Sequence, residues 1–311
     1  TNKFYSHRQN LASCQRFFWK QQIFTPLLTG TSLKIRSPHL LPNQMTNSSI
    51  HKLSNEELQV TIDEIATIVS ESDYVVGMTG AGMSVESGIP PFRGVDGLWT
   101  KYGAPKMDGY SDFKKDPTGW WNRRTNEKID SHINELRHAL TKAEPHVGHY
   151  ALVELEKQGN IQSLVTQNID ALDEKAGLQN LIEIHGNRTK LRCIECGDRV
   201  SLGDFVPLYA PDPCKKCGGI VKFDTVMFGE PIPDDVMTAA RSEINKADCV
   251  LSIGTSATVR PASGLLWIAE SLGATIIEIN PTETKLTPIC EVSLRSTAGE
   301  ALPLLFKTLS N

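Results

Sequence analysis

Four cysteines lie within one short window of this chain and could bind a metal ion together. They form two Cys-x-x-Cys pairs, Cys193 with Cys196 and Cys214 with Cys217, and seventeen residues separate the pairs. Two such pairs present four thiolates to one tetrahedral zinc ion, whereas a redox Cys-x-x-Cys motif needs only one pair. We therefore predict one Zn²⁺ per chain. Because four protein ligands leave no open coordination position, this zinc should stabilise the fold and take no part in chemistry.

Two glycine-containing turns could bind the phosphate groups of a nucleotide. Residues 80–84 (Gly-Ala-Gly-Met-Ser) and residues 254–256 (Gly-Thr-Ser) each follow a short apolar run. Glycine at such a place lets backbone N–H groups approach a pyrophosphate. A tight turn between a strand and a helix also needs glycine for its own sake, and Val85 stands where the third glycine of a dinucleotide fingerprint would be. Two such turns at the carboxyl edge of one sheet together favour a bound dinucleotide.

Polar side chains follow two further apolar runs. Thr166 to Asp170 (Thr-Gln-Asn-Ile-Asp) comes after one of them, and His185 ends the next. Any α/β protein could carry such a polar loop with helix caps, and a single histidine is more often structural than catalytic. The position of His185 at a strand end nevertheless suits a general base that reaches a ligand.

Short, continuous apolar runs predict the strands of a sheet that is buried on both faces. They lie at residues 74–78, 161–165, 181–184, 249–253 and 275–279. Helical spacing of apolar residues predicts helices that begin near Ser54 and that span residues 146–158 and 261–272. Strands that alternate with helices form a parallel, doubly wound sheet, so the predicted fold class is α/β. Residues 100–140 are polar and should form loops and a few helices.

Composition excludes several classes of protein. The chain has 311 residues, a formal net charge of −4, 40% apolar residues and 22% charged residues, which is typical of a soluble globular protein and unlike a disordered, collagenous or coiled-coil one. No apolar run approaches the ~18 residues that a membrane span needs. The mildly acidic total argues against broad nucleic-acid binding.

The N-terminal segment differs in charge from the rest of the chain. Residues 1–55 contain seven Lys or Arg and no acid, which leaves 25 Lys and Arg against 36 Asp and Glu, a net charge of −11, in residues 56–311. We expect residues 1–55 to be a disordered or targeting tail with no folded role. A cytoplasmic protein is expected, a mitochondrial matrix protein is the alternative if residues 1–44 are a transit segment, and an extension foreign to the natural protein is a third interpretation.

Together, the ordered motifs of residues 56–311 resemble those of the sirtuins, the NAD-dependent protein-lysine deacylases. The resemblance includes residues 80–84, 166–170 and 185–186, the four cysteines, Ser87 to Gly94, Gly97 to Trp99, Phe228 to Glu230, residues 254–256, and Asn280. It implies a Rossmann-like large domain, a small zinc-ribbon module at residues 187–224 and an active cleft between them. It also implies an enzyme that removes acyl groups, acetyl above all, from protein lysines and releases nicotinamide and O-acyl-ADP-ribose.

The resemblance also implies roles for individual residues. His185 would be the general base, and Asn168 would join it in the catalytic set. Val226 and Phe228 to Glu230 would border the acyl-lysine tunnel and pair with the substrate peptide as a strand, which makes Val226, Phe228, Gly229 and Glu230 the substrate-binding residues. The NAD site would comprise Gly80, Ala81, Gly82, Ser84, Ile89, Phe92, Arg93, Gln167, Asn168, Asp170, Gly254, Thr255, Ser256 and Asn280.

Within that NAD site, the resemblance assigns each group to a part of the cofactor. Ala81, Ser84 and Arg93 would line the phosphate and ribose region, and Phe92 would lie on a mobile loop over the cofactor. Gln167 and Asn168 would hold the nicotinamide ribose, Ile89 and Asp170 the nicotinamide carboxamide, and Ser256 and Asn280 the adenosine side.

The sequence departs from the family pattern at two places. Pro91 stands where many sirtuins carry Asp, and Asp173 stands where His is common. Because proline fixes φ, Pro91 should stiffen the cofactor loop. Neither change is expected to abolish the use of NAD.

The acyl pocket also carries a departure that bears on specificity. Sirtuins that remove acidic acyl groups share a Tyr-x-x-Arg pair that follows a Pro-x-x-x-Trp stretch. Here Pro117 and Trp121 supply the stretch, but Arg124 and Glu127 stand at the two following positions. We therefore expect uncharged acyl groups to be preferred over succinyl or malonyl. A one-turn shift in register would bring Arg123 or Arg124 into the pocket instead, and an exposed Glu127 would simply pair with a nearby cation.

Three other functions remain compatible with parts of the sequence. An ADP-ribosyltransferase would use the same cofactor cleft, although His185 and Phe228 to Glu230 favour deacylation. A zinc-ribbon module that binds nucleic acid is the second, since residues 187–222 carry seven Lys or Arg against four acids. A hydride-transferring dehydrogenase is the third. The expected partners are acyl-lysine proteins or peptides, not membranes, and the oligomeric state is not predicted.

Overall fold

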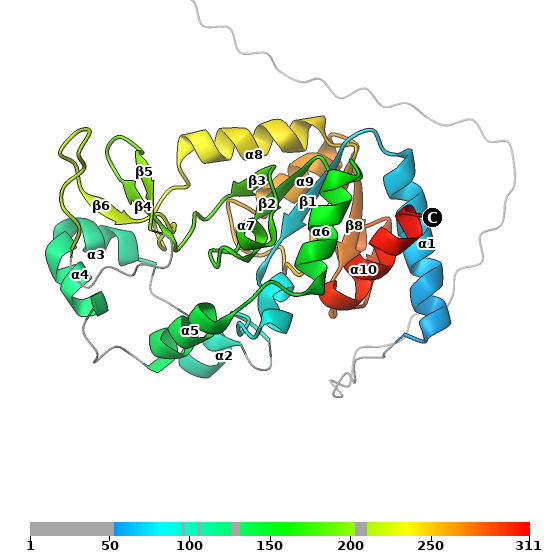
Figure 1. Ribbon diagram of the computed structural model, residues 1–311, viewed down its shortest axis with the longest axis horizontal. Coiled ribbons are helices and arrows are strands. Elements are labelled where there is room, and N and C mark those ends of the chain that lie inside the picture. The colour runs from blue at the N-terminus through cyan, green and yellow to red at the C-terminus, as the bar shows by residue number, and fades with distance from the viewer. Residues whose placement is uncertain (1–52, 95–96, 105–106, 126–130, 203–209) are drawn as a thin grey trace, which may run out of the picture. The chain divides into compact units, whose positions relative to one another are not determined.

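Six parallel strands form the central sheet of the described chain (Figure 1). The computed structural model describes residues 53–311 except 95–96, 105–106, 126–130 and 203–209. The strands follow the order β3-β2-β1-β7-β8-β9, and every neighbouring pair is parallel. They are β1 (Val75–Thr79), β2 (Ser163–Thr166), β3 (Leu181–Glu183), β7 (Cys249–Ile253), β8 (Thr275–Ile279) and β9 (Val292–Leu294). The five predicted strands and the doubly wound α/β fold are confirmed, and β9 is an additional strand.

The strand order reverses between β1 and β7. The chain runs from β1 outward to β2 and β3, and later continues from β7 outward to β8 and β9 on the other side. In a doubly wound sheet, ligands bind in the crevice beyond the carboxyl ends of the strands at such a switch point. The two glycine-containing turns follow these two strands directly, so the fold brings both turns to the switch point.

Helices cover both faces of the sheet, which is why the strands are apolar on both sides. Alternate residues of β7 enter different cores, with Leu251 on one face and Val250 on the other. The first face is covered by α1 (Asn55–Glu71), α6 (Val147–Lys157) and α10 (Ala298–Leu309), and the second by α8 (Asp234–Lys246) and α9 (Gly264–Ser271). In α1, the predicted start is confirmed by a capping box between Ser54 and Glu57. No helix among the described residues is long and apolar enough to cross a membrane.

A second, antiparallel sheet carries the cysteines. It has the order β5-β4-β6 and consists of β4 (Lys190–Cys193), β5 (Arg199–Ser201) and β6 (Val221–Phe223). Two helices pack on this sheet, α3 (Gly109–Lys115) through Phe113 and α4 (Pro117–Thr125) through Trp121. Residues 187–224 are therefore not packed alone, because the segment before them in the sequence supplies part of their core.

Short helices make up most of the remaining described chain. They are the 3-10 segments η1 (Ala81–Ser87) and η2 (Thr287–Ile289) and the α-helices α2 (Leu98–Tyr102), α5 (Ser131–Lys142) and α7 (Leu172–Ala176). The expected tail at residues 1–55 lies almost wholly outside the described residues, since the description begins at residue 53.

Candidate active site

The two glycine turns at the switch point touch each other through their backbones. The N–H of Gly82 donates to the carbonyl of Gly254 at 2.8 Å, and the N–H of Gly80 donates to that of Ile253 at 3.0 Å. A Cβ atom on Gly82 would lie 2.7 Å from Cα of Gly254, and one on Gly80 would lie 2.7 Å from Cβ of Thr255. The glycines are thus required by the close approach of the two turns, and this approach builds one continuous polar edge at the switch point.

The polar residues after β2 are hydrogen-bonded to both glycine turns. The side-chain amide of Gln167 donates to the hydroxyl of Thr255 at 2.9 Å. That of Asn168 donates to the carbonyl of Gly80 at 2.9 Å and to the hydroxyl of Ser84 at 3.1 Å. Sequence motifs that lie more than 80 residues apart therefore form one site, as their positions at strand ends predicted.

Ser84 and Asp170 form a buried hydrogen bond beneath this edge. The hydroxyl of Ser84 donates to the carboxylate of Asp170 at 2.6 Å, and both residues are buried. Burial raises the pKa of Asp170, while the hydrogen bonds from Ser84 and from the N–H of Leu172 oppose that rise. Since its hydroxyl is already used, Ser84 is placed to orient Asn168 and Asp170.

His185 is oriented by a backbone carbonyl. Its Nδ1 lies 3.0 Å from the carbonyl oxygen of Gln167, which can only accept a hydrogen bond. Nδ1 therefore carries the proton of the neutral ring, and Nε2 is left as the nitrogen that can accept one. Burial lowers the pKa of His185, so the ring stays neutral to a lower pH than usual. The backbone carbonyl of His185 accepts from the N–H of Val226 at 2.8 Å, which ties the imidazole to the segment predicted to bind substrate.

Arg93 lies at the exposed side of the switch point and is held there by two contacts. Its guanidinium donates to the hydroxyl of Thr258 at 2.8 Å and stacks on the ring of Trp99 at 4.3 Å. Thr258 in turn lies 2.8 Å from the hydroxyl of Ser256, next to the second glycine turn. These contacts bring an exposed cation and two hydroxyls together, as binding of a diphosphate requires.

A row of aromatic rings leads from Arg93 toward the zinc sheet. Phe92 lies 5.4 Å from Trp99, and Trp99 lies 5.7 Å from Phe228. Phe228 is 36% exposed, and its carbonyl accepts from the N–H of Tyr110 on α3 at 3.1 Å. Gly229 adopts φ +81°, a conformation that favours glycine.

Two further predicted NAD residues lie next to the hydrogen-bonded edge. Ile89 is buried against Ala143 and Leu172, below the loop that carries Phe92. Asn280 follows β8, and its side-chain amide donates to the carbonyl of Thr282 at 2.6 Å. The structure thus places Asn280 at the same carboxyl edge, one strand beyond the β7 turn.

The donor set at this edge fits a dinucleotide. Amide and hydroxyl groups of Gln167, Asn168, Ser256 and Asn280 suit ribose hydroxyls, and the exposed Arg93 suits a diphosphate. The backbones of Ala81 and Thr255 lie in the two turns between them.

The four cysteines fit a single zinc ion. Their sulfur atoms all lie within 4.8 Å of one another, with Cys193 and Cys217 at 3.5 Å and Cys196 and Cys214 at 3.7 Å. A Zn–S bond of about 2.3 Å places the sulfur atoms of a tetrahedral site about 3.8 Å apart, which agrees with these distances. Each pair also closes a turn through a backbone hydrogen bond, from Gly197 to Cys193 at 3.0 Å and from Gly218 to Cys214 at 2.7 Å.

Comparison with known proteins agrees with this arrangement. Residues 80–261 match the model of the Sir2 family. A relative from Archaeoglobus fulgidus, "NAD-dependent protein deacylase 1", is 40% identical over 246 residues, which cover 79% of this chain and 96% of that protein. The chain belongs to the Sir2 family.

Solved structures of Sir2 proteins share the fold. A Sir2 homologue mutant in complex with 2'-O-acetyl ADP ribose is 40% identical, with a TM-score of 0.66, over 79% of this chain and 96% of that one. A Sir2 complex with a p53 peptide and NAD⁺ is 28% identical, with a TM-score of 0.62, over 78% and 96% of the two chains. The Rossmann-like fold and the sirtuin resemblance are thereby confirmed.

Several residues that support this Sir2 site carry little signal in the sequence. Thr258 and Trp99 hold Arg93, and Trp99 was predicted only as part of the Gly97 to Trp99 motif. His149 and Asp173 are buried together, with Nε2 of the imidazole 4.0 Å from the carboxylate. Burial lowers the pKa of His149 to about 3 and raises that of Asp173 to about 7. The departure at residue 173 thus places an acid in the protein interior, next to Asp170.

Two predictions for this Sir2 chain concern Glu127 and Pro91, which lie within or near segments outside the described residues. Glu127, expected in the acyl pocket, lies outside the described residues. Trp121, which precedes it, is buried, and its ring lies 4.8 Å from that of Phe223. The carbonyl of Pro91 accepts a hydrogen bond from the N–H of Leu98 at 2.9 Å.

Proposed function

We propose that this chain is an NAD-dependent protein-lysine deacylase that acts preferentially on acetyl-lysine and releases nicotinamide and O-acyl-ADP-ribose. The observation that carries the proposal is the placement of His185. Its neutral imidazole is oriented by a hydrogen bond to the carbonyl of Gln167, the residue before Asn168. Its backbone carbonyl is hydrogen-bonded to the N–H of Val226. The family of the chain and the acetyl-ADP-ribose and peptide complexes of its relatives support the same activity.

The residues of the switch point would bind NAD. When bound, NAD supplies the ribose carbon that accepts the acyl oxygen as nicotinamide leaves. Arg93 and the backbone of the two glycine turns would hold the diphosphate, and Gln167 and Asn168 the nicotinamide ribose. Asp170 and Ile89 would receive the carboxamide, and Ser256 and Asn280 would contact the adenosine side. Phe92 would shield the reacting centre from water, which strengthens every polar contact within it.

His185 would act as the general base. With Nδ1–H fixed on a carbonyl, Nε2 would take the proton from a ribose hydroxyl, which becomes the nucleophile that captures the acyl group. A base with a pKa at or below neutral is unprotonated at neutral pH, as this task requires. Zn²⁺ would supply only structural stabilisation through Cys193, Cys196, Cys214 and Cys217.

The substrate peptide would pair with residues 226–229 by strand addition. Val226 and Phe228 are already hydrogen-bonded to His185 and Tyr110, so this segment is held between two parts of the protein. Strand addition reads peptide backbone, with little demand on sequence. The two-part domain organisation, with residues 187–224 as the zinc module of a 56–311 deacylase domain, follows from this proposal.

A direct assay of products tests the proposal and its rivals. The chain is incubated with NAD and an acetyl-lysine peptide, and nicotinamide, peptide mass and nucleotide products are followed. Deacetylated peptide with an equal amount of acetyl-ADP-ribose is expected. A peptide that gains ADP-ribose would instead indicate a transferase to protein side chains, and reduced nicotinamide would indicate a dehydrogenase. No use of NAD, with salt-dependent DNA binding, would favour a nucleic-acid module.

The cytoplasmic location and its mitochondrial alternative stay predictions, because residues 1–52 lie outside the described residues.

A further inference from the structure

Three cations form a row across one face of the zinc sheet. Arg192 on β4 lies opposite Arg199 on β5 and opposite Lys222 on β6. Like charges that face each other directly across strands destabilise a sheet. Such a row therefore needs carboxylates placed between its members.

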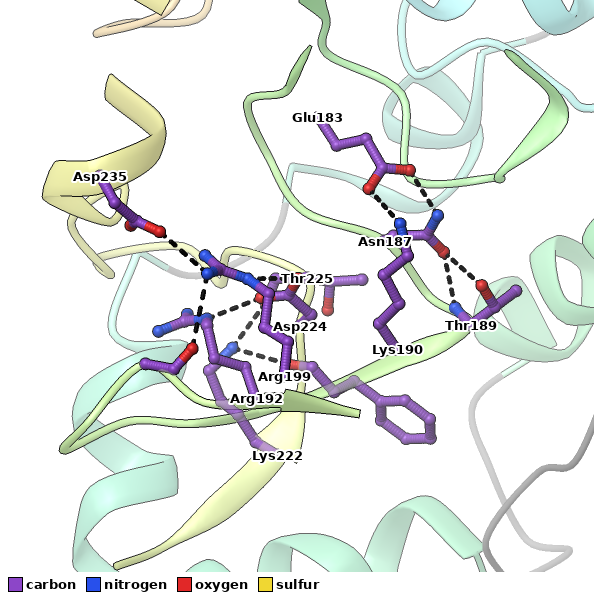
Figure 2. A network of polar contacts seen from close by, with 12 residues as sticks. Glu183, Asn187, Thr189, Lys190, Arg192, Arg199, Lys222, Asp224, Thr225 and Asp235 are labelled. Carbon is purple, nitrogen blue, oxygen red and sulfur yellow. Dashed lines mark hydrogen bonds and ion pairs between the residues drawn. The ribbon is translucent and has the colours of Figure 1, made fainter. Parts of the chain in front are cut away.

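Two carboxylates from the following segment fill those places. Asp224 accepts from Nε of Arg192 at 2.7 Å and from Nε of Arg199 at 3.1 Å (Figure 2). Glu230 accepts from the guanidinium of Arg192 and lies 3.0 Å from Nζ of Lys222. The side chains of Arg192, Lys222, Asp224 and Glu230 are each 7% exposed or less. Because two cations face two anions, the buried charge is balanced.

This network fixes the backbone of residues 223–230. Lys222 Nζ donates to the carbonyls of Phe223 at 2.9 Å and Thr225 at 2.7 Å. The carboxylate of Glu230 accepts from the N–H of Met227 at 2.8 Å. The side chain of Glu230 therefore points into the protein. It binds Lys222, which precedes Val226 in the sequence, and the N–H of Met227, which follows Val226.

The same segment also contacts the turn that carries His185. The N–H of Val226 donates to the carbonyl of His185. At Gly186, with φ +74°, a Cβ atom would lie 1.8 Å from the carbonyl oxygen of Asp224. On the far side of that turn, Lys190 is paired with Glu183 at 2.7 Å (Figure 2). The contacts of Val226 with His185 and of Asp224 with Gly186 thus hold residues 224–230 next to His185, the proposed base.

We propose that Glu230, held by Arg192 and Lys222, is a positioning residue that fixes residues 226–229 in the conformation that accepts the substrate peptide. Its carboxylate does not touch the peptide; it acts through the backbone N–H of Met227. The zinc sheet then has a role in substrate binding, because it carries the two cations. This inference rests on the proposed deacylase function and gives Glu230 an indirect role in peptide recognition, in place of the direct contact that the resemblance implied.

Glu230→Gln tests the inference, because it keeps the shape of the side chain and removes its charge. We expect the KM for an acetyl-lysine peptide to rise by about tenfold or more, as expected when a buried charge-assisted hydrogen bond is lost. The Kd for NAD should change less than about twofold, and zinc content should stay that of the wild type. Glu270→Gln, at an exposed position on α9, is the matched control and should leave both constants unchanged.

A second variant guards against a folding defect. Lys222→Met combined with Glu230→Gln removes one charge of each sign and leaves Arg192 paired with Asp224. Since removal of both partners of a buried pair is often tolerated, this chain should fold, and its peptide KM should still be raised. An unchanged peptide KM in either variant, or an equal rise in the Kd for NAD, would overturn the inference. If the wild type itself releases no nicotinamide, the proposed deacylase function fails, and this inference fails with it.

Discussion

His185 is the residue on which the proposed chemistry depends most directly. We expect His185→Ala to lower the rate of acetyl-ADP-ribose formation by about 10²–10⁴-fold, the usual contribution of a general base. NAD binding, measured by calorimetry, should change little, because the diphosphate and ribose contacts come from other residues. His138→Ala, at an exposed position on α5, is the control and should keep both properties.

The pH profile gives the same residue a second readout. Since burial lowers the pKa of His185, the acid limb of kcat/KM in the wild type should lie below the usual value of about 6.5. Near-wild-type activity in His185→Ala would show that another group is the base.

Asp173 makes stability depend on pH in a direction opposite to that of most carboxylates. Its pKa is about 7 in the folded chain, against about 3.9 in an unfolded one. Between these values the folded chain holds a proton that the unfolded chain has released, so the stability contributed by this group falls as pH rises from about 4 to 7. His149 acts in the other direction, because its folded pKa of about 3 lies below the unfolded value of about 6.5.

Asp173→Asn should isolate the contribution of the carboxylate. We expect the Tm of the variant, relative to that of the wild type, to increase steadily between pH 5 and pH 8, because the variant has no carboxylate to desolvate. The His149 contribution is present in both chains and cancels in the difference. A Tm difference that is the same at both pH values would contradict the buried, proton-binding role of Asp173.

At the level of secondary structure, the elements that could be predicted are those whose own apolar pattern encodes them. β1 and β7 are five-residue apolar runs buried on both faces, and α1 carries both an apolar stripe and a capping box. The strand β9 has three residues, with Ser293 between two apolar ones, and β5 is wholly exposed. Such short strands are stabilised by their neighbours, β9 by its pairing with β8 and β5 by its pairing with β4, which leaves no periodic signal in the sequence.

The composition of the candidate site could be predicted better than the direction of its side chains. Strand-end positions placed Gln167, Asn168 and His185 together, because parallel strands share a carboxyl edge. That Ser84 points inward to Asp170, and that Glu230 points into the zinc sheet, depends on partners distant in the sequence. Long-range packing of this kind has no local pattern from which it could be inferred.

The cysteine turns should control the stability of the zinc sheet as one unit. We expect Cys193→Ala or Cys217→Ala to abolish the binding of about one zinc per chain and to lower the Tm, because metal binding is coupled to folding of such a module. Both variants should also weaken peptide binding, since Cys193 adjoins Arg192 and the second cysteine pair precedes Lys222. The measurements are metal content, Tm and peptide KM.

Cys290→Ala is the control for this prediction. Cys290 is half-buried and lies far along the sequence, where its thiol donates to the carbonyl of Leu286. It should keep one zinc per chain. A metal-free preparation of the wild type with full activity and unchanged Tm would refute a structural role for zinc.

For the whole molecule, net charge bears on the choice of substrate. Residues 56–311 carry a net charge of −11. An excess of one sign produces a field that attracts opposite charges and repels like ones over distances set by the salt concentration. A lysine-rich peptide should therefore approach this chain more readily than an acidic one, and an acidic acyl group gains nothing from the field.

We predict that the chain prefers acetyl-lysine to succinyl-lysine by about tenfold or more in kcat/KM, as expected for a carboxylate that loses water without gaining a partner. No Tyr-x-x-Arg pair follows Trp121, and Glu127 stands where the arginine would be, so the sequence offers no dedicated receptor for that carboxylate. The test compares one peptide with acetyl-, butyryl- or succinyl-lysine. The uncharged butyryl group separates the effect of size from that of charge.

A change of salt separates the long-range field from contacts within the pocket. Raising ionic strength from 0.01 M to 0.15 M shortens the screening length from about 30 Å to about 8 Å. This change should reduce the difference in kcat/KM between the acetyl and succinyl peptides only by the part that the long-range field contributes. A higher kcat/KM for the succinyl peptide would show that a cation, such as Arg123 or Arg124, faces the acyl group after all.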